Sequence, residues 1–184
     1  MSNINIHRLS TNALVFSTLL SGSLFASVTP AIELANGQTA FESAPRLIRA
    51  TSSFKSRNLP TATYHFTLQV PENAGEPLKA VKIEGRNNSE VIEFDVRKSR
   101  AFIGDSLAGG QALSVSSVSG TSKADEVTVV FDQPVSPGST VTVALKLKRN
   151  PFNPGVYLFG VTAFPEGENG QGLYLGSGRI QIYH

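Results

Sequence analysis

The chain has few side chains of the types that carry catalysis, and they are scattered. It contains 3 histidines, no cysteine, and 1 methionine, which is the initiator. His7 lies in the N-terminal leader that we predict below, so His65 and His184 remain for acid–base or metal chemistry, and we expect both to be solvent-facing. Two distant histidines without a G-x-S-x-G motif predict no Ser-His-Asp triad, and the usual ligands of structural zinc or copper are missing. The sequence therefore names no catalytic residue, no metal ligand and no cofactor.

Carboxylates leave one catalytic chemistry open, because two acids can meet through folding without any sequence spacing. The acids that fall on predicted strands and loops are Glu93, Asp95, Asp105, Asp125, Asp132, Glu166 and Glu168. We expect them to be solvated strand and turn residues. One alternative is a carboxylate pair that hydrolyses a polysaccharide. Another is a calcium site from Glu166, Glu168 and Asn169, since calcium takes oxygen ligands, although no EF-hand pattern accompanies them.

Two basic clusters are the strongest charge features of the sequence. Arg97, Lys98 and Arg100 form the denser one, and the other lies at 146–149. Charged edge strands resist sheet-to-sheet aggregation, and we expect that role for both clusters. The alternative is a site for a polyanion such as an envelope polysaccharide. The glycine-containing stretch 104–110 lacks the Lys-Ser/Thr ending and the following helix of a phosphate-binding loop.

The overall charge excludes one class of partner. The chain has 16 basic and 14 acidic residues, and without Arg8 of the N-terminal segment it has 15 basic residues against 14 acidic. Such a near-neutral balance lacks the basic footprint of a protein that binds DNA or RNA. We therefore expect no nucleic-acid partner.

The N-terminal segment reads as a signal peptide. A short polar start ends in His7-Arg8, and residues 13–28 are apolar but interrupted by hydroxyl side chains. These 16 residues are too short and too polar to span a bilayer, but they fit a signal-peptide core before small residues. We predict a signal peptide at 1–31, with Ala26 and Ala35 as alternative cleavage sites, or alternatively an N-terminal helix of the domain. Later residues contain no apolar run of spanning length, and without cysteine we expect no lipid anchor and no disulfide.

The rest of the chain, 32–184, reads as one all-β domain. Apolar and polar residues alternate in five stretches, as in half-buried strands: 64–70, 81–84, 92–97, 127–132 and 141–148. Val156–Phe164 is apolar on both faces and predicts a central strand that is covered on both sides. The apolar face switches across Gly176–Gly178, which predicts a bulge within 173–183. Shorter candidate strands lie at 46–50, 101–103 and 112–118.

Turn-forming residues separate these stretches at regular intervals, and no amphipathic helix is apparent. Many short strands with such spacing are typical of a sandwich or a small barrel. We predict a two-sheet, immunoglobulin-like sandwich of about seven to nine strands.

Several longer motifs carry a family resemblance. The most specific is NPFNPGVYLFGVTAFP at 150–165, and the others lie at 59–66, 70–78, 99–104, 137–143 and 175–179. Together they make the chain, from about residue 32 to 184, similar to a family of exported cyanobacterial proteins catalogued as domain of unknown function 2808. The resemblance implies an envelope, periplasmic or released protein of a photosynthetic bacterium. It implies no activity and no site residues.

These observations favour a non-catalytic binding or structural module of the cell envelope or extracellular matrix. Its partner would be an envelope protein or a glycan, in the periplasm or outside the cell. The alternative is a secreted carboxylate-dependent hydrolase acting on polysaccharide. A third hypothesis, a subunit of the photosynthetic apparatus in the thylakoid lumen, depends on the implied host alone.

Overall fold

The computed structural model describes residues 32–33, 37–120 and 125–184. The predicted signal peptide at 1–31 lies outside the described residues and stays a prediction. Among the described residues, no helix is long and apolar enough to cross a membrane. The one helical element there is a single 3-10 turn, Val96–Lys98.

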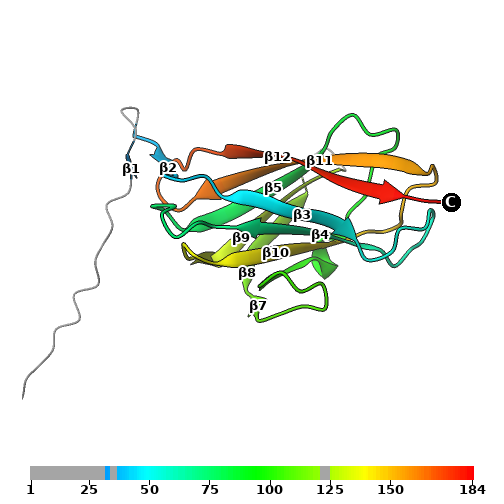
Figure 1. Ribbon diagram of the computed structural model, residues 1–184, viewed down its shortest axis with the longest axis horizontal. Helices are drawn as coiled ribbons and strands as arrows, with labels where there is room; N and C mark the ends of the chain where they lie inside the picture. Colours follow the sequence, from blue (N-terminus) through cyan, green and yellow to red (C-terminus); the bar gives the residue numbers. More distant parts are fainter. Residues whose placement is uncertain (1–31, 34–36, 121–124) are drawn as a thin grey trace, which may run out of the picture.

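The strands form two antiparallel five-stranded sheets that run along the long axis of the molecule (Figure 1). The first, called here the β4 sheet, has the order β3 (Arg46–Ser52), β4 (Thr63–Gln69), β10 (Thr140–Lys146), β6 (Arg100–Ile103) and β7 (Ala112–Leu113). The second, called the β11 sheet, has the order β12 (Leu173–Ile182), β11 (Gly155–Pro165), β5 (Leu78–Gly85), β9 (Glu126–Val135) and β8 (Val115–Gly120). A separate pair joins β1 (Ile32–Glu33) to β2 (Thr39–Ala40). The predicted all-β, two-sheet sandwich is confirmed.

The core lies between the two sheets, where the predicted apolar faces meet. Tyr64, Phe66 and Leu68 of β4 are fully buried, as is Phe159 of β11. The ring of Phe159 lies at the centre, with its centroid 5.5 Å from that of Tyr64, 5.7 Å from Phe66 and 6.2 Å from Phe94. The pairs with Tyr64 and Phe66 are edge-to-face, and such pairs add about 0.5–1.5 kcal/mol each beyond the burial of their area.

Two strand predictions change in detail. The stretch 92–97 is not a strand: only Phe94 forms a bridge, to Leu147, and the chain then turns into the 3-10 helix. Its alternation reflects burial, because Ile92 and Phe94 still point into the core. The candidate at 112–118 is two strands, because β7 pairs in the β4 sheet and β8 in the β11 sheet. The predicted bulge in β12 is present, and the pairing skips one residue between Tyr174 and Gly176.

The outer face of β4 is buried, contrary to the prediction. His65 is 6% exposed and Thr67 is fully buried, although both alternate with the core residues and were expected to face solvent. The cover comes from neighbouring segments, which sequence alternation does not report. Arg49 and Thr142 contact Thr67, and Phe54 and the loop between β6 and β7 line the hollow around His65.

The outer face of β11 is more exposed to solvent than we predicted. The strand is central, since β12 and β5 flank it, and Tyr157, Phe159 and Val161 are buried. On its other face, however, Val156 and Leu158 are 41% and 38% exposed. An apolar run on both faces therefore does not require that both be covered in an antiparallel sheet.

Candidate functional site

The acids named from the sequence make separate contacts in the described structure. Lys98 pairs with Asp95 at 3.3 Å, and Lys148 pairs with Glu93 at 2.7 Å. The backbone carbonyl of Asp132 accepts from Lys79, and that of Glu168 accepts from Thr39. The backbone carbonyls of Asp105 and Asp125 accept from Arg49 and from the Gly85 amide.

The calcium alternative finds no support in the described part of the chain, where no three acid or histidine side chains form a metal-ligand set. Glu166 contributes instead to a group of acids around Glu76, which lies near both Glu166 and Glu42. Burial raises the pKa of Glu76, and the negative charges of Glu166 and Glu42 add to that rise.

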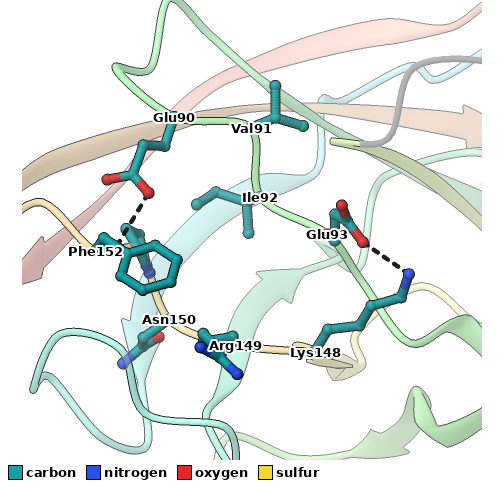
Figure 2. Close-up of a pocket in the computed structure, with 9 residues that line it drawn as sticks. Glu90, Val91, Ile92, Glu93, Lys148, Arg149, Asn150 and Phe152 are labelled. Carbon is teal, nitrogen blue, oxygen red and sulfur yellow. Dashed lines mark hydrogen bonds and ion pairs between the residues drawn. The ribbon is translucent and has the colours of Figure 1, made fainter.

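Two carboxylates, Glu90 and Glu93, do line one hollow of about 260 Å³ at an end of the sandwich. The two carboxylates lie on opposite sides of Ile92, and each already has a hydrogen-bond or ion-pair partner (Figure 2). Glu90 accepts the backbone N–H groups of Phe152 at 3.0 Å and Asn153 at 2.6 Å, and Glu93 holds Lys148.

The pKa of Glu90 also argues against a catalytic acid in this hollow. Although burial acts to raise the pKa of Glu90, the N–H donors of Phe152 and Asn153 hold it below its usual value. A general acid of a glycosidase needs the opposite shift. The hollow therefore gives no support to the carboxylate-dependent hydrolase.

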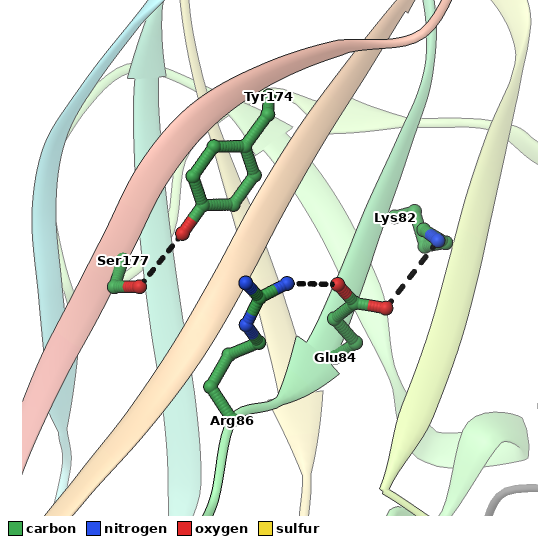
Figure 3. A network of polar contacts seen from close by, with 5 residues as sticks. All are labelled: Lys82, Glu84, Arg86, Tyr174 and Ser177. Atoms are coloured by element: carbon green, nitrogen blue, oxygen red, sulfur yellow. Dashed lines mark hydrogen bonds and ion pairs between the residues drawn. The ribbon is translucent and has the colours of Figure 1, made fainter.

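A second polar cluster covers the outer face of the β11 sheet (Figure 3). The carboxylate of Glu84 contacts Lys82 at 3.4 Å and Arg86 at 2.8 Å. The guanidinium of Arg86 lies 5.3 Å from the ring centroid of Tyr174, whose hydroxyl is 2.8 Å from that of Ser177. Although partial burial acts to raise the pKa of Glu84, the hydrogen bond from Arg86 and the charge of Lys82 lower it. The charges of this cluster are satisfied among themselves.

The outer face of the β4 sheet is shaped by the loop between β6 and β7, residues 104–111. Gly104 begins the loop with φ 100°, a left-handed conformation that favours glycine. Its carbonyl accepts from the Thr142 hydroxyl at 2.8 Å, and the Asp105 carbonyl accepts from the Arg49 guanidinium. These bonds hold the loop over one side of the sheet.

Beside this loop is a hollow of about 490 Å³, which we call the His65–Arg100 pocket. Its wall comes from four segments, and the residues that line it include Phe54, Thr61, Thr63, His65, Arg100 and Leu107. No carboxylate is among its described lining residues. The pocket is therefore cationic where the rest of the protein is nearly neutral.

His65 is the unusual group of this pocket. Its ring is buried, and its Nδ1 has no hydrogen-bond partner in the described structure. Burial lowers the pKa of His65 below its usual value, and the positive charges of Arg49 and Arg100 add to that effect. A buried polar atom without a partner is uncommon in folded proteins and calls for an explanation, such as a ligand or water.

The basic cluster predicted as one unit is divided by the fold. Arg97 and Lys98 lie on the 3-10 helix, where Lys98 pairs with Asp95, while Arg100 lies on β6 next to Ala144 and lines the pocket. No ion pair involves Arg100 within the described residues. The sequence drew attention to Arg100 but missed Arg49 and the burial of His65, because no local pattern shows which face the 104–111 loop covers.

Comparison with protein families places the chain in one of them. The model of a family described as "Protein of unknown function (DUF2808)" matches residues 38–182. The chain belongs to the DUF2808 family. The resemblance predicted from the motifs at 59–179 is confirmed to that extent, and the cyanobacterial origin stays a prediction. A search of curated proteins gave no match.

Solved structures similar to this DUF2808 protein are β-domains of very different sequence. The collagen-binding domain of a Staphylococcus aureus adhesin is 6% identical with a TM-score of 0.40, over 72% of this chain and 93% of that one. BslA, a bacterial hydrophobin, is 14% identical with a TM-score of 0.42, over 76% and 92%. A Nocardia farcinica protein described as having an immunoglobulin-like fold is 12% identical with a TM-score of 0.40, over 74% and 99%.

Proposed function

We propose that this DUF2808 protein is a non-catalytic binding module that works outside the cytoplasm and takes its ligand in the His65–Arg100 pocket. The observation that carries the proposal is the pocket itself: it combines an unpaired arginine, a buried imidazole without a partner at Nδ1, and no carboxylate among its described lining residues. A cavity with a few convergent polar groups is the usual form of a binding site.

Binding fits the chemistry of this pocket better than catalysis does. A nucleophilic mechanism needs a hydroxyl in hydrogen-bond contact with a base, and a third group that orients the base. The hydroxyls of Thr61 and Thr63 line the pocket, but Nδ1 of His65 bonds to neither in the described structure, and no carboxylate there orients the ring. The same groups are well suited to hydrogen-bond a ligand.

The location outside the cytoplasm depends on the predicted signal peptide at 1–31. The sequence that would be exported contains no cysteine. The periplasm and the extracellular space are the proposed compartments, with the thylakoid lumen as the alternative in a photosynthetic host. In any of them the partner would be an envelope protein or a glycan.

Fractionation tests export first. A full-length chain with a C-terminal tag should be recovered, shortened by about 3 kDa for a leader of this length, from the periplasm, the medium or the lumen. A matched chain without residues 2–31 should stay in the cytoplasm at full size. Recovery of both forms from the cytoplasm would contradict the proposal.

Retention then tests binding. The processed protein should co-sediment with insoluble envelope material from the cells that make it, in a saturable manner that the unlabelled protein competes. Recovery as a free monomer, with nothing retained at any concentration, would contradict the proposed function.

A further inference from the structure

We propose that the His65–Arg100 pocket recognises a carboxylate-bearing sugar, such as a uronate unit of an acidic polysaccharide. This inference rests on the proposed function and adds the chemical class of the ligand. It goes beyond the basic cluster predicted from the sequence, because it assigns ligand recognition to Arg100 and His65 and not to Arg97, Lys98 and Arg100 together.

Arg100 supplies the charge for this recognition. It is exposed on β6, lines the pocket, and has no ion-pair partner within the described residues. A guanidinium presents two parallel N–H groups that match the two oxygens of a carboxylate. The absence of acids from the described lining means that nothing in the pocket competes for this fork.

His65 supplies a buried hydrogen-bonding group on the floor of the pocket. With 6% of its surface exposed, the ring lines the hollow, and its buried Nδ1 has no partner within the described residues. A neutral imidazole can accept a hydrogen bond from a hydroxyl through one ring nitrogen or donate one to an oxygen through the other. Sugars carry hydroxyls next to the carboxylate of a uronate, so one unit can engage both His65 and Arg100.

The remaining lining fits a sugar ring more than a bare anion. The Phe54 ring is 52% exposed at the rim of the pocket and offers an apolar surface for the C–H face of a sugar. The Thr61 and Thr63 hydroxyls supply small donors and acceptors, and the chain at Gly109 and Gly110 brings backbone groups to the other side. This mixture of one cation, several hydroxyls and one apolar surface matches an acidic sugar.

Arg49 acts as a positioning residue behind the pocket. Its guanidinium donates to the Asp105 carbonyl and lies 3.4 Å from the Thr67 hydroxyl. It thereby holds the 104–111 loop beside His65, and its charge opposes protonation of the imidazole. The loop therefore forms a wall of the pocket before any ligand binds.

Calorimetric titration of the processed protein with tetragalacturonate tests the inference, with maltotetraose as the neutral control. We expect saturable binding of the uronate at one site and none of the neutral sugar. The variant R100Q should weaken binding by about tenfold or more, the usual loss for a charged hydrogen bond. The matched variant R97Q removes the same charge from the nearby 3-10 helix and should change the affinity by less than about twofold, as for a charge outside the contact. Equal weakening by both variants would overturn the inference.

A second variant guards against misfolding of R100Q. Leu107 is 45% exposed on the loop and lines the pocket, so L107E places a carboxylate at the pocket wall without disturbing the core. It should also weaken uronate binding by about tenfold. If both R100Q and L107E are folded and bind as the unmodified protein does, the inference is wrong.

Other probes separate this inference from the proposed function. Binding of a sulfated tetrasaccharide or a poly-glutamate peptide, with none of tetragalacturonate, would overturn the uronate assignment while leaving a binding module in place. The same holds if the protein is retained on envelope material but ignores all uronates. Loss of retention as well would contradict the proposed function itself.

Discussion

The two outer faces of the sandwich differ in whether their charged side chains have partners. On the β11 sheet, Glu84 lies between Lys82 and Arg86, and Tyr174 covers the guanidinium, so each charge has a partner. On the β4 sheet, Arg100 has no ion-pair partner in the described structure, and His65 is buried with Nδ1 unbonded. A face whose charged groups all have partners offers little to a ligand, whereas an arginine without an ion-pair partner beside a hollow can bind an anion.

The difference arises from a loop and not from the strands. On the β4 sheet the connection at 104–111 folds over the outer face and makes a wall, held there by Thr142 and Arg49. The β11 face keeps Val156 and Leu158 partly exposed. The comparison therefore predicts that substitutions at equivalent positions on the two faces have unequal effects.

The largest expected effect on stability comes from a substitution in the core between the two sheets. Phe159→Ala should lower the free energy of unfolding by about 3–5 kcal/mol, because it leaves a cavity among Tyr64, Phe66 and Phe94. Leu158→Ala, the next residue on the outer face, should cost about 1 kcal/mol or less. Urea denaturation measures both, and equal losses would contradict the assignment of inner and outer faces.

The next effect compares matched threonines on the two faces. Thr142→Val on the β4 sheet removes a buried hydroxyl that lies 3.0 Å from the Thr67 hydroxyl and bonds to the Gly104 carbonyl. Its partners stay buried, so the loss should be about 1–3 kcal/mol.

Thr162→Val on the half-buried outer face of β11 is the control for this substitution, and it should stay within about 0.5 kcal/mol of the unmodified protein. Thermal unfolding of both variants checks the difference. Identical midpoints would show that the loop is not held by the Thr142 hydroxyl.

His65 should give the β4 face a pH effect of its own. Because the pKa of His65 is lower in the folded protein than in the unfolded chain, the unfolded chain takes up the proton first. Its contribution to stability is complete above about pH 6.5 and is lost as the pH falls towards the folded value, at up to about 1.4 kcal/mol per pH unit.

Comparison with His65→Gln isolates this contribution. The charged groups that act on the ring are Arg49 of β3 and Arg100 of β6, and both oppose protonation. The difference in unfolding free energy between the two proteins should shrink between pH 7.5 and pH 5 in urea titrations. A constant difference would mean that His65 is accessible to solvent in the folded state.

The smallest expected effect is on the β11 face. Glu84→Gln removes two ion pairs at the surface and should cost about 1 kcal/mol or less. It also leaves Lys82 and Arg86 without a carboxylate. We expect calorimetry to show no gain in tetragalacturonate binding, because the proposed site needs the hollow as well as a cation. A new binding event in this variant would show that unpaired surface cations are sufficient.

The sequence predicted the inner faces well and the outer faces poorly. Alternation at 64–70 and 141–148 identified the core residues, since apolar side chains on one face of a strand must be buried somewhere. The same pattern misplaced His65, whose cover comes from Arg49, Phe54 and a distant loop. It also overstated the cover of Leu158, because nothing in a strand's own sequence reports what packs on its far side.

The candidate site shows the same limit. Arg100 stood out in the sequence as part of a basic cluster, and the glycines of 104–110 indicated a loop. Their meeting with His65 depends on the pairing of β4, β10 and β6, which is a contact between residues far apart in the chain. Paired carboxylates could be judged only once Glu90 and Glu93 were seen in other roles.

An NMR titration of the nitrogen-15-labelled processed protein with tetragalacturonate tests the central claim most directly, because it observes both faces at once. We predict saturable shifts of the His65 imidazole nitrogens, the Arg100 side-chain nitrogen and the Gly109 amide, with the amides of Glu84 and Tyr174 unchanged. Shifts centred on the β11 face, or spread equally over both faces, would contradict the account.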